Sequence, residues 1–376
     1  MNDRLFEFLI QCCQDNPSQD DIYSIVTAID TQDIIEHAQK QGILPIVYKR
    51  LKSIDNIPND LLSKLKIRYM QIAQKNILMS AELIKIIKLL ETNNIKAIAF
   101  KGPTLAQLAY GDITMRQFGD LDIIVEEKNL DKVGQILSSK YRALLPLSIL
   151  KNNICIQTAK DFSFISNTDI HIELHWRLFE KKYNITSFSE IFHHQYSFIN
   201  INNQKVNTLP TDILLVYLCL HGAKHQFERI EWIVDIDKLI CTDSINWKNV
   251  IQYVKNSHSN KPFYLGLAIS SHLFSTPLPK DFIYKIQDKN IQILKQHIVK
   301  KLQSPSNLKT QKEKNKETFL FQSKLFNNWN DRFHFYFSTF FKISTTDCQT
   351  FILPEKLKFL YFILRPLRII FKYTKS

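Results

Sequence analysis

The sequence predicts an α+β fold in which a small mixed sheet is flanked by helical domains on its N- and C-terminal sides. Short strand-like runs separated by turns gather at residues 95–176, and the chain on either side follows a helical period. The chain has only 7 glycines, where average usage would give roughly 26, and three of them fall between positions 102 and 119. We therefore expect backbone conformations that require glycine in this short stretch of the predicted core.

The N-terminal residues 1–93 are expected to form a helical domain. Apolar residues recur with helical spacing over 72–90, and Lys85 and Lys88 lie on the outer side. The run Thr92-Asn93-Asn94 then ends this helix.

Residues 94–180 are expected to form the core domain. Its elements are a strand at 95–100, a turn at Lys101-Gly102 into a helix that ends near Gly111, a strand at 120–125, a helix over about 127–139, and a hairpin with strands at 162–165 and 170–176.

The rest of the chain is expected to be helical, as one domain over 181–294 and a basic region over 295–376. A helix starts after Pro210, and a second helix carries Trp232 and Asp235. Polar, lysine-rich residues at 302–317 favour an exposed loop. Most of the formal charge of +13 lies in this quarter, because seven Lys stand against one Glu in 295–316 and six Lys or Arg against one Glu in 355–376.

Composition excludes several classes of protein. With 45% apolar and 12% aromatic residues, the chain is not intrinsically disordered in the main. The N-terminus has no secretory signal pattern, and no apolar run suggests a transmembrane segment. Six cysteines without a CxxC pair suggest free thiols in a reducing compartment. We therefore expect a cytoplasmic protein.

Two acidic residues stand at alternate positions of the strand at 120–125. Because side chains alternate across a strand, Asp120 and Asp122 project from one face. Neighbouring carboxylates repel each other, and a hard divalent cation such as Mg²⁺ relieves the repulsion. A solvated strand edge is the alternative interpretation of this pair.

The second strand of the hairpin has its own polar face, which carries His171, Glu173 and His175 with apolar residues between them. If this strand lies beside 120–125, Glu173 completes a three-carboxylate site that can hold two metal ions for an in-line displacement at phosphorus. A polar hairpin face in water is one alternative, and a zinc hydrolase built on the three residues of that face is another.

The turn Lys101-Gly102-Pro103-Thr104 precedes the acidic pair. Glycine between a strand and a helix lets backbone amides approach phosphate oxygens, and the helix N-terminus favours an anion. Lys101 adds a positive charge. Such turns also use glycine for geometry alone, so the indication depends on its combination with the carboxylates.

This combination resembles the polymerase-β-like nucleotidyltransferases, and more closely their branch of uncharacterised bacterial nucleotidyltransferases. The resemblance is strongest in FKGPTLAQLAYGDITMRQFGDLDIIV (100–125) and IELHWRL (172–178). It extends to GILPIVYKRL (42–51), HGAKHQFERIEWIVDID (221–237) and LPEKLKFLYFILRPLRIIFKY (353–373).

The resemblance implies a role for each matching residue. Asp120 and Asp122 would bind two Mg²⁺ ions, or Mn²⁺ in their place, and Glu173 would bind the catalytic ion and orient or deprotonate an acceptor hydroxyl. Gly102 would pack against the triphosphate. The superfamily commonly has serine after this glycine, so here the serine contact is either missing or supplied by Thr104.

Further polar residues are candidate contacts of the nucleotide. Arg116 would either reach a phosphate or lie on the surface. His221, Lys224 and His225 share one helical face, which would close over the nucleotide with Lys224 on a phosphate, or hold zinc through its two histidines. Asp235 would orient one of these histidines or lie on a helix surface.

The sequence thus predicts a Mg²⁺-dependent nucleotidyltransferase that moves a nucleoside monophosphate from an NTP such as ATP to an acceptor hydroxyl and releases pyrophosphate. Small molecule, peptide, protein and tRNA acceptors all stay open, as does the oligomeric state. A nucleic-acid-binding protein with little or no catalysis and a kinase that uses the same metal site are the alternatives. The basic, aromatic tail fits RNA, an anionic membrane surface or packing against the body.

Overall fold

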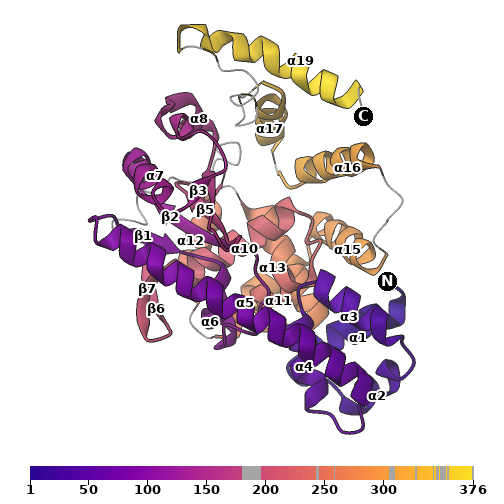
Figure 1. Cartoon of the computed structure of the whole chain (residues 1–376). Coiled ribbons are helices and arrows are strands. Elements are labelled where there is room, and N and C mark those ends of the chain that lie inside the picture. Colours follow the sequence, from indigo (N-terminus) through magenta and orange to yellow (C-terminus); the bar gives the residue numbers. More distant parts are fainter. Residues whose placement is uncertain are drawn as a thin grey trace.

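The computed structural model describes residues 1–179, 196–242, 245–257, 259–304, 310–326 and 328–341, together with 343, 347, 353 and 355–374. Within these residues the chain forms a seven-stranded mixed sheet surrounded by helices (Figure 1). The predicted α+β class is confirmed.

Five helices precede the sheet, as the sequence predicts for residues 1–93. They are α1 (Asp3–Cys13), α2 (Gln19–Val26), α3 (Thr31–Lys40), α4 (Leu44–Lys52) and α5 (Asn59–Glu91). The helical period over 72–90 belongs to the second half of α5, which is 33 residues long and runs from the other N-terminal helices to the sheet (Figure 1). Met79, Leu83 and Leu90 of that half are buried with the sheet residues.

The sheet contains the strands that the sequence predicts. The strand at 120–125 lies beside the second strand of the predicted hairpin. The strands are β1 (Ala97–Ala99), β2 (Asp120–Val125), β3 (Arg142–Ala143), β4 (Asp161–Ile165), β5 (His171–His175), β6 (Ser197–Ile201) and β7 (Gln204–Thr208), in the order β3-β4-β5-β2-β1-β7-β6. β4 and β5 form the predicted antiparallel hairpin. β2 is central, with antiparallel β1 on one side and parallel β5 on the other.

The hairpin of β6 and β7 is a difference from the sequence analysis, which expected helices after residue 180. Asn202 and Asn203 both have positive φ angles, of 49° and 61°, as a tight hairpin turn requires. β7 pairs in parallel with β1 at Ala99 and Thr208. The sheet therefore extends beyond the expected core of 94–180.

The two faces of the sheet are covered by different helices. Three short helices and two 3-10 helices lie in the core region: α6 (Gly102–Tyr110), α7 (Leu130–Ser138), α8 (Asn153–Thr158), η1 (Glu127–Asn129) and η2 (Leu147–Lys151). Leu121, Ile123 and Val125 of β2 are buried in one cluster with residues of α5 and α7. Ile124 of the same strand belongs to a second cluster on the opposite face, together with α10 (Thr211–Lys224). Asp120 and Asp122 project from that second face.

The helices after the sheet share a core with the N-terminal helices. Besides α10 they are α11 (Ile230–Ile240), α12 (Trp247–Asn256), α13 (Asn260–Phe274), α14 (Lys280–Ile286), α15 (Lys289–Gln303), α16 (Gln311–Lys324), α17 (Trp329–Phe341), η4 (Glu355–Leu360) and α19 (Tyr361–Thr374). One hydrophobic cluster contains residues from α1 to α4 and residues from α10 to α16. The expected N-terminal and C-terminal helical domains therefore pack against each other around one core.

The predicted lysine-rich loop over 302–317 is in part helical, so that prediction is wrong for residues 302–303, which end α15, and for 311–317, which begin α16. Thr310 caps α16: its hydroxyl accepts from the amide of Glu313, and the carboxylate of Glu313 accepts from the amide of Thr310. Residues 305–309 lie outside the described part of the chain.

From the sequence, we expect no transmembrane segment and no disulfides. None of the described helices is both long and apolar enough to cross a membrane. No disulfide joins the described cysteines, Cys12, Cys13, Cys155, Cys219 and Cys241, and Cys348 lies outside the described residues.

Candidate active site

The parallel pairing of β2 and β5 brings the two predicted polar faces together. In this register Asp120 lies opposite His171, and Asp122 lies opposite Glu173. Because side chains at alternate positions share a face, the acidic residues of both strands point toward α10. The strand that carries Glu173 thus lies beside the strand of Asp120 and Asp122, which is the arrangement in which Glu173 can complete the three-carboxylate site.

Asp122 is the most deeply buried acid of this face, since its side chain is fully enclosed. Its Oδ1 lies 3.0 Å from Nζ of Lys101 and 3.0 Å from Nε2 of His175. Burial by itself would raise the pKa of Asp122, but Lys101 and His175 outweigh burial and hold that pKa well below its usual range. Its other oxygen, Oδ2, is buried and has no hydrogen-bond partner.

His175 connects the two strands at the level of the carboxylates. It is 1% exposed, and its Nε2 also lies 3.3 Å from Oε2 of Glu173. Burial would lower the pKa of His175, whereas its bonds to Asp122 and Glu173 raise it, with a net rise. The edge of its ring faces Phe100, with 5.1 Å between the ring centroids. From the sequence, His175 is expected on this face, with a role only in the alternative zinc hydrolase.

The side chains that offer metal ligands here are Asp122, Glu173 and His175. One ligand atom from each lies within 4.8 Å of the others. Asp120 is outside this group, at the more exposed start of β2. Burial and the neighbouring Asp122 raise the pKa of Asp120, while Lys101 opposes the rise. Of the three predicted carboxylates, Asp122 is therefore fully buried, while Asp120 and Glu173 are partly exposed. His175 lies next to Asp122 and Glu173.

The donor set fits a divalent cation. Carboxylate oxygens are the ligands that Mg²⁺ prefers, and Mn²⁺ accepts both carboxylate and imidazole ligands. The buried Oδ2 of Asp122 lacks a partner, and such an atom is costly to bury unless a cation or a donor completes it. Glu173 supplies a second, half-buried carboxylate beside it.

The turn between β1 and α6 rests directly on the start of β2. Gly102 has a φ of +47°, and a Cβ at this position would come within 3.1 Å of the carbonyl oxygen of Asp120. Only glycine fits such a close, left-handed turn without strain. Thr104 is buried, and its hydroxyl donates to the carbonyl of Lys101 at 2.8 Å. This hydrogen bond of Thr104 stabilises the turn that contains Lys101.

Arg116 is bound to Asp235, so it is neither a surface residue nor directed to solvent. Its Nε and Nη2 donate to the carboxylate of Asp235 at 2.9 Å each, and Nη1 donates to the carbonyl of Gln117 at 3.3 Å. The hydroxyl of Tyr110 donates to the same carboxylate at 2.8 Å. Asp235 is fully buried, so its expected position on a helix surface is wrong, and the described contacts join it to Arg116 and Tyr110.

His221 of α10 and His225, the residue that caps this helix, belong to a row of rings that begins beside Lys101. The ring of Tyr217 lies 5.8 Å from Nζ of Lys101, and His221 stacks on Tyr217 with centroids 5.6 Å apart. His225 follows at 4.9 Å from His221. Burial, and then the charge of Lys101, lower the pKa of His221 well below its usual value, which favours a neutral ring. Lys224, the third candidate on this helix, is half-buried in its last turn.

Two residues of the site were not found from the sequence. Lys160 precedes β4, forms an ion pair with Asp161, and its positive charge helps to lower the pKa of Glu173. Tyr217 packs between Phe100 and Lys101. Lys160 stands in no recognisable pattern, whereas Tyr217 precedes His221 by one helical turn, and this spacing was a usable signal. His171, by contrast, is exposed at the start of β5.

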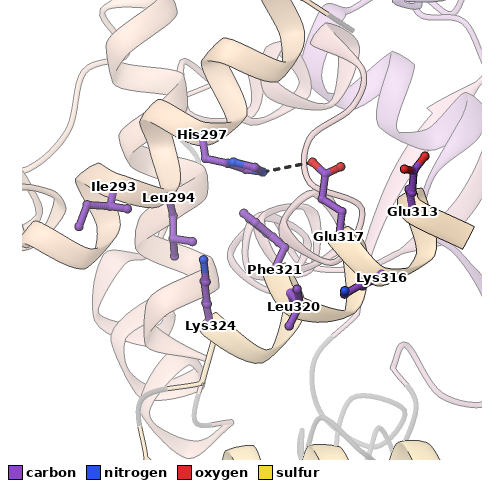
Figure 2. A pocket seen from close by; sticks show the side chains of 9 residues that line it. All are labelled: Ile293, Leu294, His297, Glu313, Lys316, Glu317, Leu320, Phe321 and Lys324. Carbon is purple, nitrogen blue, oxygen red and sulfur yellow. Dashed lines mark ion pairs between the residues drawn. The ribbon is translucent and has the colours of Figure 1, made fainter. Parts of the chain in front are cut away.

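A separate pocket of about 530 Å³ lies between α15 and α16, and Figure 2 shows the side chains that line it. His297 of α15 faces Glu317 of α16 at 3.7 Å, and its ring stacks on Phe321. Lysines and glutamates both line this pocket around an apolar floor. It shares no residue with the cluster of Asp122, Glu173 and His175.

Comparison with known proteins shows the family of this chain. A family model described as an uncharacterised nucleotidyltransferase matches residues 27–275, a range that includes every predicted site residue. No curated protein matches the chain significantly. Among solved structures, an antigenic nucleotidyltransferase-like protein from Paracoccidioides brasiliensis matches with 16% identity and a TM-score of 0.34, over 57% of this chain and 92% of its own.

Proposed function

We propose that this chain, which belongs to the family of uncharacterised nucleotidyltransferases, moves a nucleoside monophosphate from an NTP to an acceptor hydroxyl and releases pyrophosphate. The acceptor is a small molecule, a peptide, a protein or tRNA, and ATP is the first NTP to test. The reaction is proposed to take place in the cytoplasm, where thiols such as those of Cys12, Cys13 and Cys219 stay reduced.

The environment of Asp122 is the observation that carries this proposal. A carboxylate that is fully enclosed, held ionised by Lys101 and His175, and left with one oxygen unpaired is arranged for a cation. Asp120, Asp122 and Glu173 are the residues proposed to hold two Mg²⁺ ions. When bound, these ions would stabilise the charge that develops on the triphosphate and on the attacking oxygen.

The residues around the carboxylates have separate proposed roles. Gly102 brings the backbone of the turn close to the site, so that a triphosphate can lie against it. Lys101 neutralises Asp122 and reaches a phosphate once the carboxylate has another partner. His175 holds Asp122 and Glu173 in position, since its Nε2 is near both.

The mouth of the site is proposed to receive the acceptor. Glu173 is one-third exposed, and its bond to His175 lowers its pKa, so that it is an ionised base at neutral pH. It would orient the acceptor hydroxyl and accept its proton. His221, His225 and Lys224 are proposed to lie over the nucleotide from α10. Arg116 is proposed to position α11 through Asp235 and not to contact a phosphate.

The released product distinguishes this reaction from its alternatives. The full chain is incubated with Mg²⁺, cell extract and ATP labelled on either the α- or the γ-phosphorus, and then with the other NTPs. We expect α-label on an acceptor together with pyrophosphate. Transfer of γ-label with release of ADP would instead assign a kinase, and salt-dependent RNA binding without turnover would assign a nucleic-acid-binding protein.

A further inference from the structure

The C-terminal helices of the described chain expose an unusual number of large apolar side chains. α17 and α19 lie together at one end of the molecule, beyond α16 (Figure 1). A soluble surface commonly scatters such residues singly, whereas here they gather on two neighbouring helices and on η4. The exposed members are Trp329, Phe333, Phe337, Phe340, Phe341, Leu357, Phe359, Phe362, Ile363, Leu367 and Phe371.

On α17 the exposed rings form one ridge. Trp329, Phe333, Phe337 and Phe341 follow each other at intervals of four residues and so lie on one side of the helix. Neighbouring rings of the last three stack, with centroids 6.3 Å and 5.1 Å apart. Trp329 at the start of the ridge is 80% exposed. The inward side is represented by Phe335, which is 1% exposed.

α19 is attached through its basic side, so that its apolar side faces outward. Arg365 and Arg368 both bind the carboxylate of Asp347, which is fully buried, and Arg365 also donates to the carbonyl of Thr339 on α17. Ile363, Leu367 and Phe371 of α19 lie at four-residue intervals and are exposed, as is Phe359 in the preceding η4. This orientation is the reverse of that of a helix covering a soluble core.

An exposed apolar surface of this kind indicates a binding partner. The net charge of the segment distinguishes among a second copy of the chain, RNA and a lipid bilayer. Residues 355–376 contain six Lys or Arg and a single acidic residue, Glu355. A second copy of the chain would bring an equally basic surface against it. RNA bases stack on aromatic rings or arginine planes, but both described arginines of α19 are bound to Asp347, and aliphatic Ile363 and Leu367 occupy the middle of the exposed stripe.

We propose that α17 and α19 form a surface that binds anionic phospholipid bilayers, with the two exposed stripes inserted at the boundary between headgroups and acyl chains. Aromatic and aliphatic side chains on one side of a helix, in a segment rich in Lys and Arg, are the features of helices that lie in this interface. Besides the two arginines bound to Asp347, residues 355–376 contain Lys356, Lys358, Lys372 and Lys375, and a lysine-rich segment attracts negative lipid headgroups. This inference is independent of the reaction proposed for the sheet.

The test is co-sedimentation of the full chain with vesicles, either of phosphatidylcholine alone or of equal parts of phosphatidylcholine and phosphatidylglycerol. We expect binding to the anionic vesicles, weaker binding to the neutral ones, and a blue shift of tryptophan fluorescence that is lost in Trp329→Ser. The double variant Phe333→Ser/Ile363→Ser should bind about tenfold more weakly or worse, because two large apolar side chains no longer leave water. The control Tyr284→Ser changes an equally exposed residue on α14 and should bind as the wild type does.

Unchanged thermal unfolding of each variant shows that it is folded. The proposal is overturned if the wild type ignores anionic vesicles, or if the double variant and the control bind equally. It is also overturned if the same substitutions abolish self-association or RNA binding and leave lipid binding intact.

Discussion

Asp122 owes its ionised state to two side chains rather than to water. Lys101 and His175 both contact its Oδ1, while its Oδ2 is buried without a partner. An ionised carboxylate in such a place is stable only while its cationic neighbours remain, because removing one of them leaves an uncompensated buried charge. The contribution of Lys101 to this carboxylate can therefore be measured by replacing the lysine.

Lys101→Met should lower the free energy of unfolding by about 3 kcal/mol in the presence of a chelator, since Asp122 then keeps only His175. Mg²⁺ should raise the unfolding temperature of this variant more than that of the wild type, because binding to the folded state stabilises it. Thermal unfolding with EDTA and with Mg²⁺ measures both effects. Lys128→Met, at an exposed ion pair with Glu126, is the matched control. An equal response to Mg²⁺ in variant and wild type would contradict the assignment.

A second buried acid, Glu231 on α11, links stability to pH. Burial raises the pKa of Glu231 to about 7 although Arg116 and Arg229 oppose the rise and Asp235 and Asp120 add to it. Its Oε2 lies 3.0 Å from Nη2 of Arg229, and its Oε1 is buried without a partner. The folded state therefore binds a proton that the unfolded state releases near the ordinary glutamate pKa of 4.5.

Because the folded-state pKa is the higher one, this stabilisation is full below the unfolded value and is lost as the pH rises through about 7. Between about pH 5 and pH 8 the wild type should lose up to roughly 3 kcal/mol more than Glu231→Gln, whose side chain does not titrate. Denaturant unfolding at both pH values gives the comparison, with exposed Glu228→Gln as the control. Parallel pH profiles of wild type and Glu231→Gln would refute the linkage.

Among the elements, α10 connects the site to the rest of the molecule. Apart from its partly exposed ends it is buried on all sides, between the carboxylate face of the sheet and helices α11 and α13. Gly222 lies in its last turn, where glycine costs helix stability. A close neighbour at this position would account for the glycine. The structure gives the place to Phe227, whose fully buried ring would lie 2.1 Å from a Cβ at Gly222.

Gly222→Ala should therefore destabilise the fold by about 1–3 kcal/mol, since the overlap outweighs the better helix propensity of alanine. The midpoint of denaturant unfolding measures the change. Gly119→Ala is the comparison, because a Cβ at Gly119 meets no atom within 4 Å. A Gly222→Ala protein as stable as the wild type would show that the Phe227 ring can move aside.

At the scale of the whole molecule, sequence patterns recovered local structure and missed long-range partners. β2 was predicted with its bounds because Asp120 and Asp122 alternate with apolar residues, whereas the burial of both its faces was not predicted. β6 and β7 were missed although Asn202-Asn203 is a hairpin turn. The start of α16 was predicted as a loop because its lysines are typical of a solvated segment. The capping box at Thr310, which begins the helix, was not recognised.

Other features of the site lay beyond any local pattern. Arg116 and Asp235 are 119 residues apart, and nothing near either residue indicates that they meet. The contact of His175 with Asp122 follows from the parallel pairing of β2 and β5, and the burial of Asp122 follows from α10 covering that face of the sheet. The sequence supports the choice of carboxylates, whereas tertiary packing decides which of them is enclosed and what holds its charge.

Transfer of α-label from an NTP to an acceptor in the presence of Mg²⁺, compared among wild type, Asp122→Asn and Asp131→Asn, tests the central claim most directly. Asp131 lies in an exposed ion pair with Lys151 and serves as the matched control. We expect Asp122→Asn to lose label transfer by about a hundredfold or more, because it removes the enclosed metal ligand, and Asp131→Asn to keep the wild-type rate. Label transfer that survives in Asp122→Asn would contradict the account.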